Sequence, residues 1–498
     1  MTVSADPVDH VELRSGAYAD SVALLQVSKD VARIDGVLAA QVAMATELNI
    51  DVIQGMGFSV PEATGNDMII ALRLTSSDRI EAALAAVDRA IEATRRQPSG
   101  AAGEVTEPPR TTGRGLSITR AGLALVSVPG PSATVEAMDA LEAGQDVMIF
   151  SDNVPLAEEV TLKNYAAKQD LLVMGPDCGT AVVEGVGLGF ANTVRPGPVG
   201  IVAASGTGCQ QLLALLDYAE VGVSAALGVG GRDLSAEVRG TSTLHAMRRL
   251  DEDPDTELIV VVSKPPAKEV AKDLQKYAES LSTPVEFALL GDGQPDLTQA
   301  AEKIVAALGR EAGQWPVWGE ASGGRGGRLR GLFAGGTLCD ESMLLAQSVL
   351  GPVWSNIPLN EDRRLDSTLD AGGTVMIDFG SDEMTQGRPH PMIEPTIRLQ
   401  HLRRVSADPE VGCVLLDVVL GHGADADPAA TIAPAIREAI SAAREGGREL
   451  AIVVSCIGTS GDPQGLDRQA QALADAGAEV HLSNAQATRR AISLIEGV

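Results

Sequence analysis

Two glycine-rich turns carry the residue types that bind anions. Each turn follows an apolar strand and opens an apolar helix, and the two segments are Ser205-Gly206-Thr207-Gly208 and Gly335-Gly336-Thr337. Glycine lets the backbone approach a ligand closely, and successive N–H groups at a helix N-terminus attract negative charge. We therefore predict a phosphate or carboxylate at these turns. The alternative for either turn by itself is a tight connection that needs positive φ angles.

The segment Gly387-Arg388-Pro389-His390-Pro391 is a second candidate, because two prolines stiffen its backbone. Arg388 could clamp a carboxylate or phosphate with two parallel hydrogen bonds, and His390 could donate a hydrogen bond or act as a general acid or base. The alternative is a rigid loop in which His390 caps a helix. We predict that Arg388 and His390 are catalytic and that this segment faces the two turns.

Charged residues also follow two apolar strands, at the strand ends where α/β proteins place their ligands. Gly231 and Arg232 follow one strand, and Lys264 is the sole cation at the end of another. We predict that these residues contact phosphate. A loop salt bridge for Arg232 and an ion pair at a domain interface for Lys264 are the alternatives.

Two further residues are weaker candidates. His422 lies at a strand end, in Gly421-His422-Gly423, and its role stays open. Cys178 has no histidine or other base beside it in sequence, so we expect a small buried filler rather than a nucleophile.

Composition excludes several classes of function. The 498 residues include 39 Lys and Arg against 67 Asp and Glu, a net charge of −28 that disfavours nucleic acid and membrane surfaces. Apolar runs are too short to span a bilayer, and the acidic N-terminus is unlike a secretory signal, so we expect a cytoplasmic protein. Five dispersed cysteines without a CxxC pair predict neither disulfides nor a metal site.

Strand and helix patterns predict an α/β protein, with a small α+β module followed by parallel-sheet domains. Strands are expected at 37–44 and 67–75, and a helix is expected to open at Ser77 or Asp78. Linkers rich in glycine are expected at 98–115 and 320–328. The predicted domains are 1–97, 115–197, 198–312 and 328–498.

Several segments resemble known enzymes. GPDCGT, GIVAASGTG and LGVGGRDL look like the α subunit of succinyl-CoA synthetase and other NDP-forming acyl-CoA synthetases, and the last third is similar in outline to the C-terminal domain of the β subunit. SDNVPLAEEVTLK, GTGCQQL, GGRDLSAEV, VSKPPA and GRPHPMIEPT more closely resemble the FdrA family, over nearly the whole chain. The resemblance implies Rossmann-like and flavodoxin-like domains. It also matches Asp378-Phe379-Gly380 to a phosphate-loop position, so Asp378 and Gly380 are candidate phosphate contacts; a helix cap is the alternative for Asp378.

The chain departs from the synthetases at the residues that carry phosphate. No histidine lies between His245 and His390, where the resemblance would place a phosphohistidine. Ser263-Lys264-Pro265-Pro266 replaces the segment with the glutamate that orients that histidine. The chain has no recognisable ATP-grasp domain, and residues 1–97 lack the glycine-rich turn that binds CoA. We therefore do not expect autonomous ATP-driven CoA ligation.

The resemblance implies an FdrA-like subunit of a multi-subunit carbamoyl- or acyltransferase, similar to an oxamate carbamoyltransferase of ureide (allantoin) catabolism. Phosphate or carbamoyl phosphate would be the substrate, without a phosphohistidine and with no certain cofactor, although CoA is compatible with it. Other subunits of a transferase complex are the expected partners, and the chain could also self-associate. The alternatives are an acyl-CoA synthetase that works with an ATP-grasp partner, and a non-catalytic scaffold that binds CoA or a metabolite.

Overall fold

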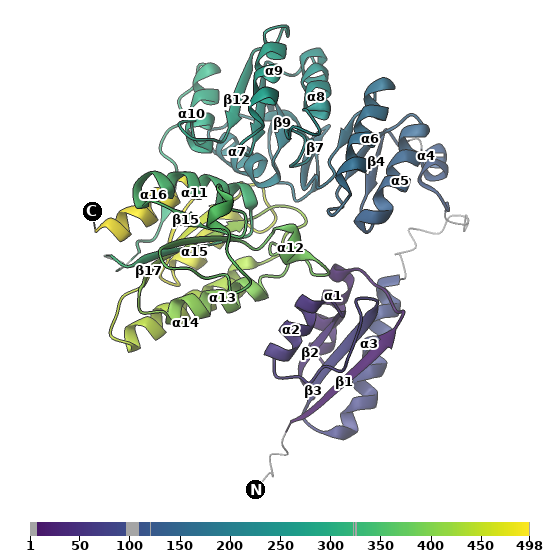
Figure 1. Cartoon of the computed structure of the whole chain (residues 1–498), viewed down its shortest axis with the longest axis vertical. Coiled ribbons are helices and arrows are strands. Elements are labelled where there is room, and N and C mark those ends of the chain that lie inside the picture. Colours follow the sequence, from purple (N-terminus) through teal and green to yellow (C-terminus); the bar gives the residue numbers. More distant parts are fainter. Residues whose placement is uncertain (1–6, 96–108, 120, 322, 324–325, 498) are drawn as a thin grey trace. The chain divides into compact units, whose positions relative to one another are not determined.

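The computed structural model describes residues 7–95, 109–119, 121–321, 323 and 326–497, and they form an α/β protein with four sheets (Figure 1). This confirms the predicted fold class. The chain divides into two compact units. The first comprises 1–107 with 381–397, and the second comprises 108–380 with 398–498. No helix among the described residues is both long enough and apolar enough to cross a bilayer.

The first unit is built on a three-stranded antiparallel sheet with the order β1-β3-β2. Alternate residues of β3 point to opposite faces, so Met68 and Ile70 join one apolar core while Ile69 and Ala71 join another. The helix expected from Ser77 begins three residues later, after a 3₁₀ turn. Its elements are β1 (Val8–Ser15), α1 (Ser21–Ala32), β2 (Val37–Met44), α2 (Glu47–Gly55), β3 (Asp67–Leu74), η1 (Ser77–Arg79) and α3 (Ile80–Arg95).

Residues 381–397 belong to this unit, although the predicted domain 328–498 contains them. The segment begins with α12 (Asp382–Thr385). The side-chain amide of Asn49 donates a hydrogen bond to the Gly387 carbonyl at 2.8 Å. Gly387 has a φ of +71°, and a Cβ there would lie 2.3 Å from the methyl carbon of Thr46, so only glycine fits this close approach. The segment therefore packs as a part of the N-terminal module.

The second unit begins with a small parallel sheet, in the order β4-β5-β6. Part of the predicted linker 98–115 is helical here, because α4 starts at Thr112; residues 98–108 lie outside the described residues. The elements are α4 (Thr112–Thr119), β4 (Leu123–Val126), α5 (Gly130–Glu142), β5 (Asp146–Ile149), α6 (Leu156–Lys168) and β6 (Val173–Met174).

The next sheet has the order β12-β11-β9-β10-β7-β8. Its first four strands are parallel, and β7 and β8 extend it antiparallel, although they fall within the predicted domain 115–197. The chain order reverses between β9 and β11, the kind of position at which open sheets bind ligands. The elements are β7 (Thr180–Val183), β8 (Val186–Gly189), β9 (Pro196–Ala204), α7 (Gly206–Tyr218), β10 (Val223–Gly228), α8 (Thr241–Glu252), β11 (Leu258–Ser263), α9 (Lys268–Ala278), β12 (Val285–Leu289) and α10 (Leu297–Ala307).

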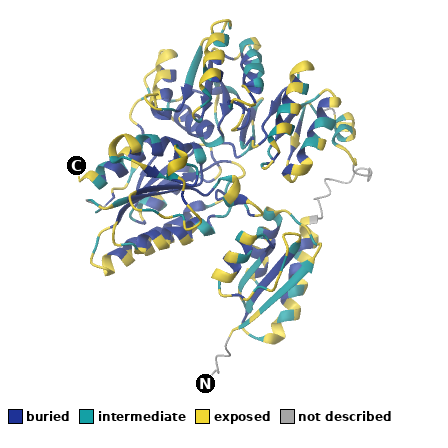
Figure 2. Ribbon diagram, viewed as in Figure 1, coloured by how far each residue is buried: buried dark blue, intermediate teal, exposed yellow. Residues whose placement is uncertain are grey.

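The last sheet has the order β13-β19-β18-β17-β14-β16-β15, and all its strands except β13 are parallel. Here the reversal lies between β14 and β17. The central strands are buried in both large sheets (Figure 2). The elements are β13 (Val317–Trp318), β14 (Arg328–Phe333), α11 (Gly336–Leu350), β15 (Val353–Trp354), η2 (Glu361–Arg363), β16 (Thr374–Asp378), α13 (Thr396–Ala407), β17 (Val411–Val419), α14 (Pro428–Glu445), β18 (Ala451–Ile457), α15 (Leu466–Ala474), β19 (Glu479–His481) and α16 (Asn484–Glu496).

Candidate functional site

The two glycine-rich turns meet within the second unit. The hydroxyl oxygens of Ser205 and Thr337 lie 2.6 Å apart, and α7 packs against α11. A Cβ on Gly335 would lie 2.8 Å from the side chain of Thr207, so glycine is needed for this approach. Two helix N-termini, each at the reversal point of its own sheet, are thus brought to one place.

Each turn is held by a local hydrogen bond. Ser205 is the N-cap of α7, and its hydroxyl accepts the N–H of Gly208 at 3.0 Å, so that donor is already used. Gly335 is the N-cap of α11, and its N–H donates at 2.8 Å to Asp417, a buried residue of β17. Gly206, Thr207 and Gly336 are half-buried, so solvent reaches the two first turns.

Lys264 lies beside the N-terminus of α11. A Cβ on Gly336 would lie 3.1 Å from Lys264 Nζ and 2.8 Å from Asp378 Oδ2. Within the described part of the chain, the Lys264 amine makes no hydrogen bond and no ion pair. Burial by itself lowers the pKa of Lys264, but the carboxylates of Asp340, Asp378 and Asp177 raise it above its ordinary value. Lys264 is therefore a cation with no direct partner among the described residues.

Two buried carboxyl groups face this cation. Burial raises the pKa of Asp378 to about 7, against the opposing effects of Lys264 and of the Gly380 N–H, which donates to Asp378 Oδ1 at 2.8 Å. Burial likewise raises the pKa of Asp340 to about 6. The site therefore combines an unpaired ammonium group with carboxyl groups that change their protonation state near neutral pH. Such a site can bind an anion and can hold or release a proton.

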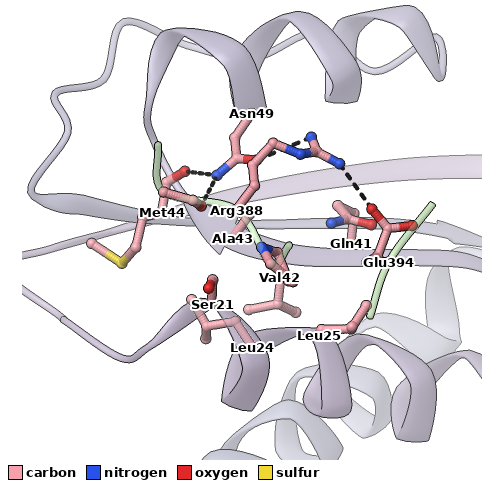
Figure 3. A pocket seen from close by; sticks show the side chains of 12 residues that line it. Ser21, Leu24, Leu25, Gln41, Val42, Ala43, Met44, Asn49, Arg388 and Glu394 are labelled. Atoms are coloured by element: carbon pink, nitrogen blue, oxygen red, sulfur yellow. Dashed lines mark hydrogen bonds and ion pairs between the residues drawn. The ribbon is translucent and has the colours of Figure 1, made fainter. Parts of the chain in front are cut away.

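Arg388 and His390 lie in the first unit, whereas both turns lie in the second. Arg388 Nη1 donates to Asn49 Oδ1 at 3.2 Å, and Nη2 pairs with Glu394 Oε2 at 3.1 Å (Figure 3). The cavity beside Arg388 has a volume of about 20 Å³, enough for one water molecule. The guanidinium group thus already holds an internal carboxylate, and the cavity has no room for an oxamate-sized ligand. His390 Nδ1 accepts the N–H of Met392 at 3.3 Å.

Arg232 and Gly231 are placed differently from Lys264. Arg232 Nε pairs with Glu159 at 2.9 Å, and its Nη2 donates to the Val154 carbonyl. Arg232 therefore forms a salt bridge, the alternative to a phosphate contact. Gly231 is exposed, near Asp177. Arg232 therefore belongs to a loop network with Glu159 and the Val154 carbonyl.

His422 and Cys178 show no catalytic arrangement. His422 Nε2 lies 3.1 Å from the hydroxyl of Thr193, and its backbone bridges to Ala191. Cys178 is buried, and burial with the neighbouring Asp177 raises the pKa of its thiol well above the ordinary range. Both observations fit structural roles.

Sequence reasoning missed two residues of the site. Asp417 accepts the N–H groups of Ala334 and Gly335 and pairs with Arg398 at 2.6 Å, so it positions the turn before α11. Asp340 lies in α11, four residues after Gly336. Asp417 is the single acid within the apolar segment Val411–Val419. Because an unpaired buried carboxylate is costly, this pattern indicates that Asp417 has bonding partners in the fold.

The chain is 37% identical over 491 residues to a protein from Escherichia coli K12 named "Uncharacterized protein YahF", covering 94% of this chain and 95% of YahF. The chain belongs to the YahF family. This agrees with the FdrA-like and succinyl-CoA synthetase-like resemblance.

Two domain families match parts of the chain. The CoA-ligase family matches residues 332–494, which include α11 and most of the last sheet. The succinate–CoA ligase α subunit of Methanothermobacter thermautotrophicus is 28% identical over 178 residues, which are 34% of this chain and 58% of that subunit. The second family, the AllF heavy metal-associated domain, matches residues 4–108.

The residues of the N-terminal module do not fit a heavy metal. Its family match spans no cysteine and a single histidine, His10, whose Nε2 lies 3.8 Å from Glu12. In the part of the chain that the structure describes, no group of three or more metal-ligating side chains is found.

Among solved structures, a dinucleotide-forming acetyl-CoA synthetase 1 from Candidatus Korarchaeum cryptofilum, in complex with phosphate and ADP, matches at 15% identity with a TM-score of 0.31. The match covers 80% of this chain and 89% of that chain.

Proposed function

We propose that the second unit binds the phosphate of an acyl phosphate between α7 and α11 and transfers the acyl group to the thiol of CoA. The chain would be the acyl-transferring component of an acyl-CoA synthetase, and a separate ATP-grasp protein would form the acyl phosphate. The observation that carries the proposal is the unpaired ammonium group of Lys264 at the meeting point of two helix N-termini. The CoA-ligase match over 332–494 supports the same class of reaction.

The reaction balances without a phosphorylated residue. The thiol sulfur forms a bond with the acyl carbon, the bond between that carbon and the phosphate oxygen breaks, and phosphate leaves with the electron pair. The thiol proton ends on the phosphate. Lys264 and the N–H groups of α7 and α11 would stabilise the charge on the departing phosphate, which is worth a few kcal/mol per donor in comparable sites. Asp378 would hold the proton in transit.

Carbamoyl phosphate is itself an acyl phosphate, so the same site suits it. The comparisons support the acyl-CoA synthetase interpretation better than the carbamoyltransferase interpretation. We therefore propose carbamoyl phosphate as one substrate to test rather than as the leading one. The partner subunits, a scaffold role and any self-association remain predictions.

The test supplies acetyl, succinyl or carbamoyl phosphate with CoA and measures thioester formation and phosphate release. We expect CoA-dependent phosphate release with at least one acyl phosphate, and its loss in Lys264→Met. Lys268→Met is the matched control, because Lys268 is exposed and only four positions away. Gly206→Val is a second, charge-neutral variant; a Cβ there meets only Thr180 and Gly179 at ordinary contact distances, so the fold should tolerate it.

Three outcomes would contradict the proposal. Turnover that Lys264→Met leaves unchanged would remove the two turns from the reaction. Absence of turnover with every acyl phosphate, in a protein that still binds sulfate, would favour the scaffold. Labelling of the purified chain by γ-phosphate-labelled ATP would also contradict it, because no histidine stands at the position expected for a phosphohistidine.

A further inference from the structure

A second cavity lies at the opposite edge of the last sheet. The two glycine-rich turns and Asp378 mark the carboxyl ends of strands, whereas this pocket opens where β14, β15 and β16 begin. Its volume is about 460 Å³, within the range of small-molecule sites. The pocket is lined by Gly327, Arg328, Leu350, Pro352, Trp354, Arg363, Gly372, Gly373, Thr374 and Ile495.

The lining combines an aromatic ring with two cations. The guanidinium carbon of Arg363 lies 5.0 Å from the centroid of the Trp354 ring, a cation–π arrangement. Arg328 also lines the pocket, and the remaining side chains are mostly apolar. None of the lining residues is an acid, although the whole chain has a net charge of −28. A planar anion fits this surface better than a cation or a neutral molecule.

Both arginines are available to a ligand. Among the described residues, Arg363 pairs with no carboxylate. Arg328 pairs with Glu410 at 2.7 Å, but these side chains are 33% and 62% exposed, and such surface pairs contribute little stability. A phosphate could therefore replace Glu410 at small cost. A Cβ on Gly372 would meet nothing within 4 Å, so the space beside this lining residue is open.

We propose that this pocket binds an adenine nucleotide, with the base against Trp354 and Arg363 and the phosphates at Arg328. An inorganic anion would leave the apolar wall uncovered, and a nucleoside would leave Arg363 without an anionic partner and Arg328 paired with Glu410. The nucleotide could be free ADP or the ADP portion of CoA, which share this chemistry. The site is separate from the acyl-transfer site proposed above and does not depend on it.

The experiment is calorimetric titration of the full chain with ADP, with adenosine and pyrophosphate as the two halves of the ligand, and with CoA to separate the sources. We expect ADP to bind at one site per chain and at least tenfold more tightly than either half. Trp354→Leu and Arg363→Gln should each weaken ADP about tenfold, the loss of one good cation or stacking contact. Arg403→Gln is the control, because Arg403 is an exposed arginine outside the pocket. Tighter binding of CoA than of ADP would identify CoA as the source.

The result that overturns the proposal is ADP binding that Trp354→Leu and Arg363→Gln both leave unchanged, or no ADP binding at all. Arg363→Gln keeps the test valid if Trp354→Leu fails to fold. ADP binding that is lost in Lys264→Met would also overturn it, because the ligand would then occupy the turns. Failure of acyl transfer with intact ADP binding would contradict only the proposed function.

Discussion

Two lysines of the second unit, Lys163 and Lys264, carry the same charge in different surroundings. Lys163, in α6, donates to Glu159 at 2.8 Å, to Asp233 at 2.7 Å and to the Val229 carbonyl at 2.9 Å. Its side chain is 1% exposed. Lys264, at the end of β11, has three carboxylates nearby but makes no direct bond to any of them among the described residues.

Lys163 is therefore a structural cation, whereas Lys264 is available to bind a ligand. All three protons of the Lys163 ammonium group have an oxygen acceptor, and the network ties α6 to the loop after β10. Such a cation has no proton left to donate to a ligand. The Lys264 ammonium group retains its full donor capacity beside two helix N-termini. A bound anion would supply the missing acceptor, so the two lysines should respond to mutation in opposite ways.

The largest effect is expected for Lys163→Met. Removing the cation leaves Asp233 as a buried carboxylate without a cationic partner and leaves the buried Glu159 with Arg232 alone, which should cost about 3 to 5 kcal/mol of stability. The measurement is urea unfolding of the transition that belongs to the second unit. Lys168→Met, an exposed lysine of the same helix, is the control. Equal transition midpoints for the two variants would contradict a structural role for Lys163.

The next effect is expected for Lys264→Met, and it should fall on binding rather than on stability. The variant removes one charged hydrogen bond to an anion, worth about 1.5 to 3 kcal/mol, so sulfate should bind roughly tenfold to a hundredfold more weakly. The unfolding midpoint should fall much less than in Lys163→Met, because Lys264 interacts with its neighbouring carboxylates only through space and makes no direct bond to them. Sulfate titration and urea unfolding of the same preparation test both statements. A marked loss of stability would show that Lys264, like Lys163, has a structural role.

A smaller effect is expected from pH. Because the pKa of Asp378 is raised to about 7, its carboxyl group is neutral below that pH and negative above it. A neutral carboxyl repels an anion less, so sulfate affinity should fall about tenfold between pH 6 and pH 8. Sulfate keeps its charge over this range. Asp378→Asn should flatten the profile, and a slope that persists in this variant would assign the proton to another group.

The raised pKa of Asp378 also makes the stability of the fold depend on pH. A folded-state pKa above the ordinary value means that the native state binds the Asp378 proton more tightly than the unfolded state does. Stability should therefore decrease as pH rises from about 4 to about 7, the interval between the two pKa values. Asp378→Asn removes this contribution. The change in the slope of unfolding free energy against pH measures it.

Local sequence predicted those parts of the site that directly follow strands. The two turns, Lys264 and Asp378 could be found because a strand end is visible as an apolar run followed by glycine or charge. Asp417 could not be assigned, since its partners at positions 334 and 335 lie more than 80 positions earlier in the chain. Which strands share a sheet was equally hidden: β7 and β8 lie in the predicted domain 115–197, and they pair in the same sheet as β9 and β10.

The placement of Arg388 depended on a contact that no local pattern encodes. Asn49 reaches the carbonyl of Gly387 across 338 positions, and that bond belongs to the first unit. Prolines beside a charged residue are equally typical of a stiff docking segment and of a ligand clamp. The amide of Asn49 and the carboxylate of Glu394 favour the docking role, because they already occupy the guanidinium group.

The smallest effect is expected for Arg388→Lys. This variant asks whether a buried cation of the first unit has the same structural role as Lys163. Arg388 is buried and bonded on two nitrogens, like Lys163, so it should belong to the framework. Lysine keeps the charge but cannot make both bonds of the planar fork, so about 1 kcal/mol of stability should be lost in the transition of the first unit. Acyl transfer should keep its turnover number and its half-saturating substrate concentration. A fall in turnover with an unchanged unfolding transition would instead show that Arg388 takes part in the reaction. It would also show that a cation already bonded to two side chains can still act on substrate.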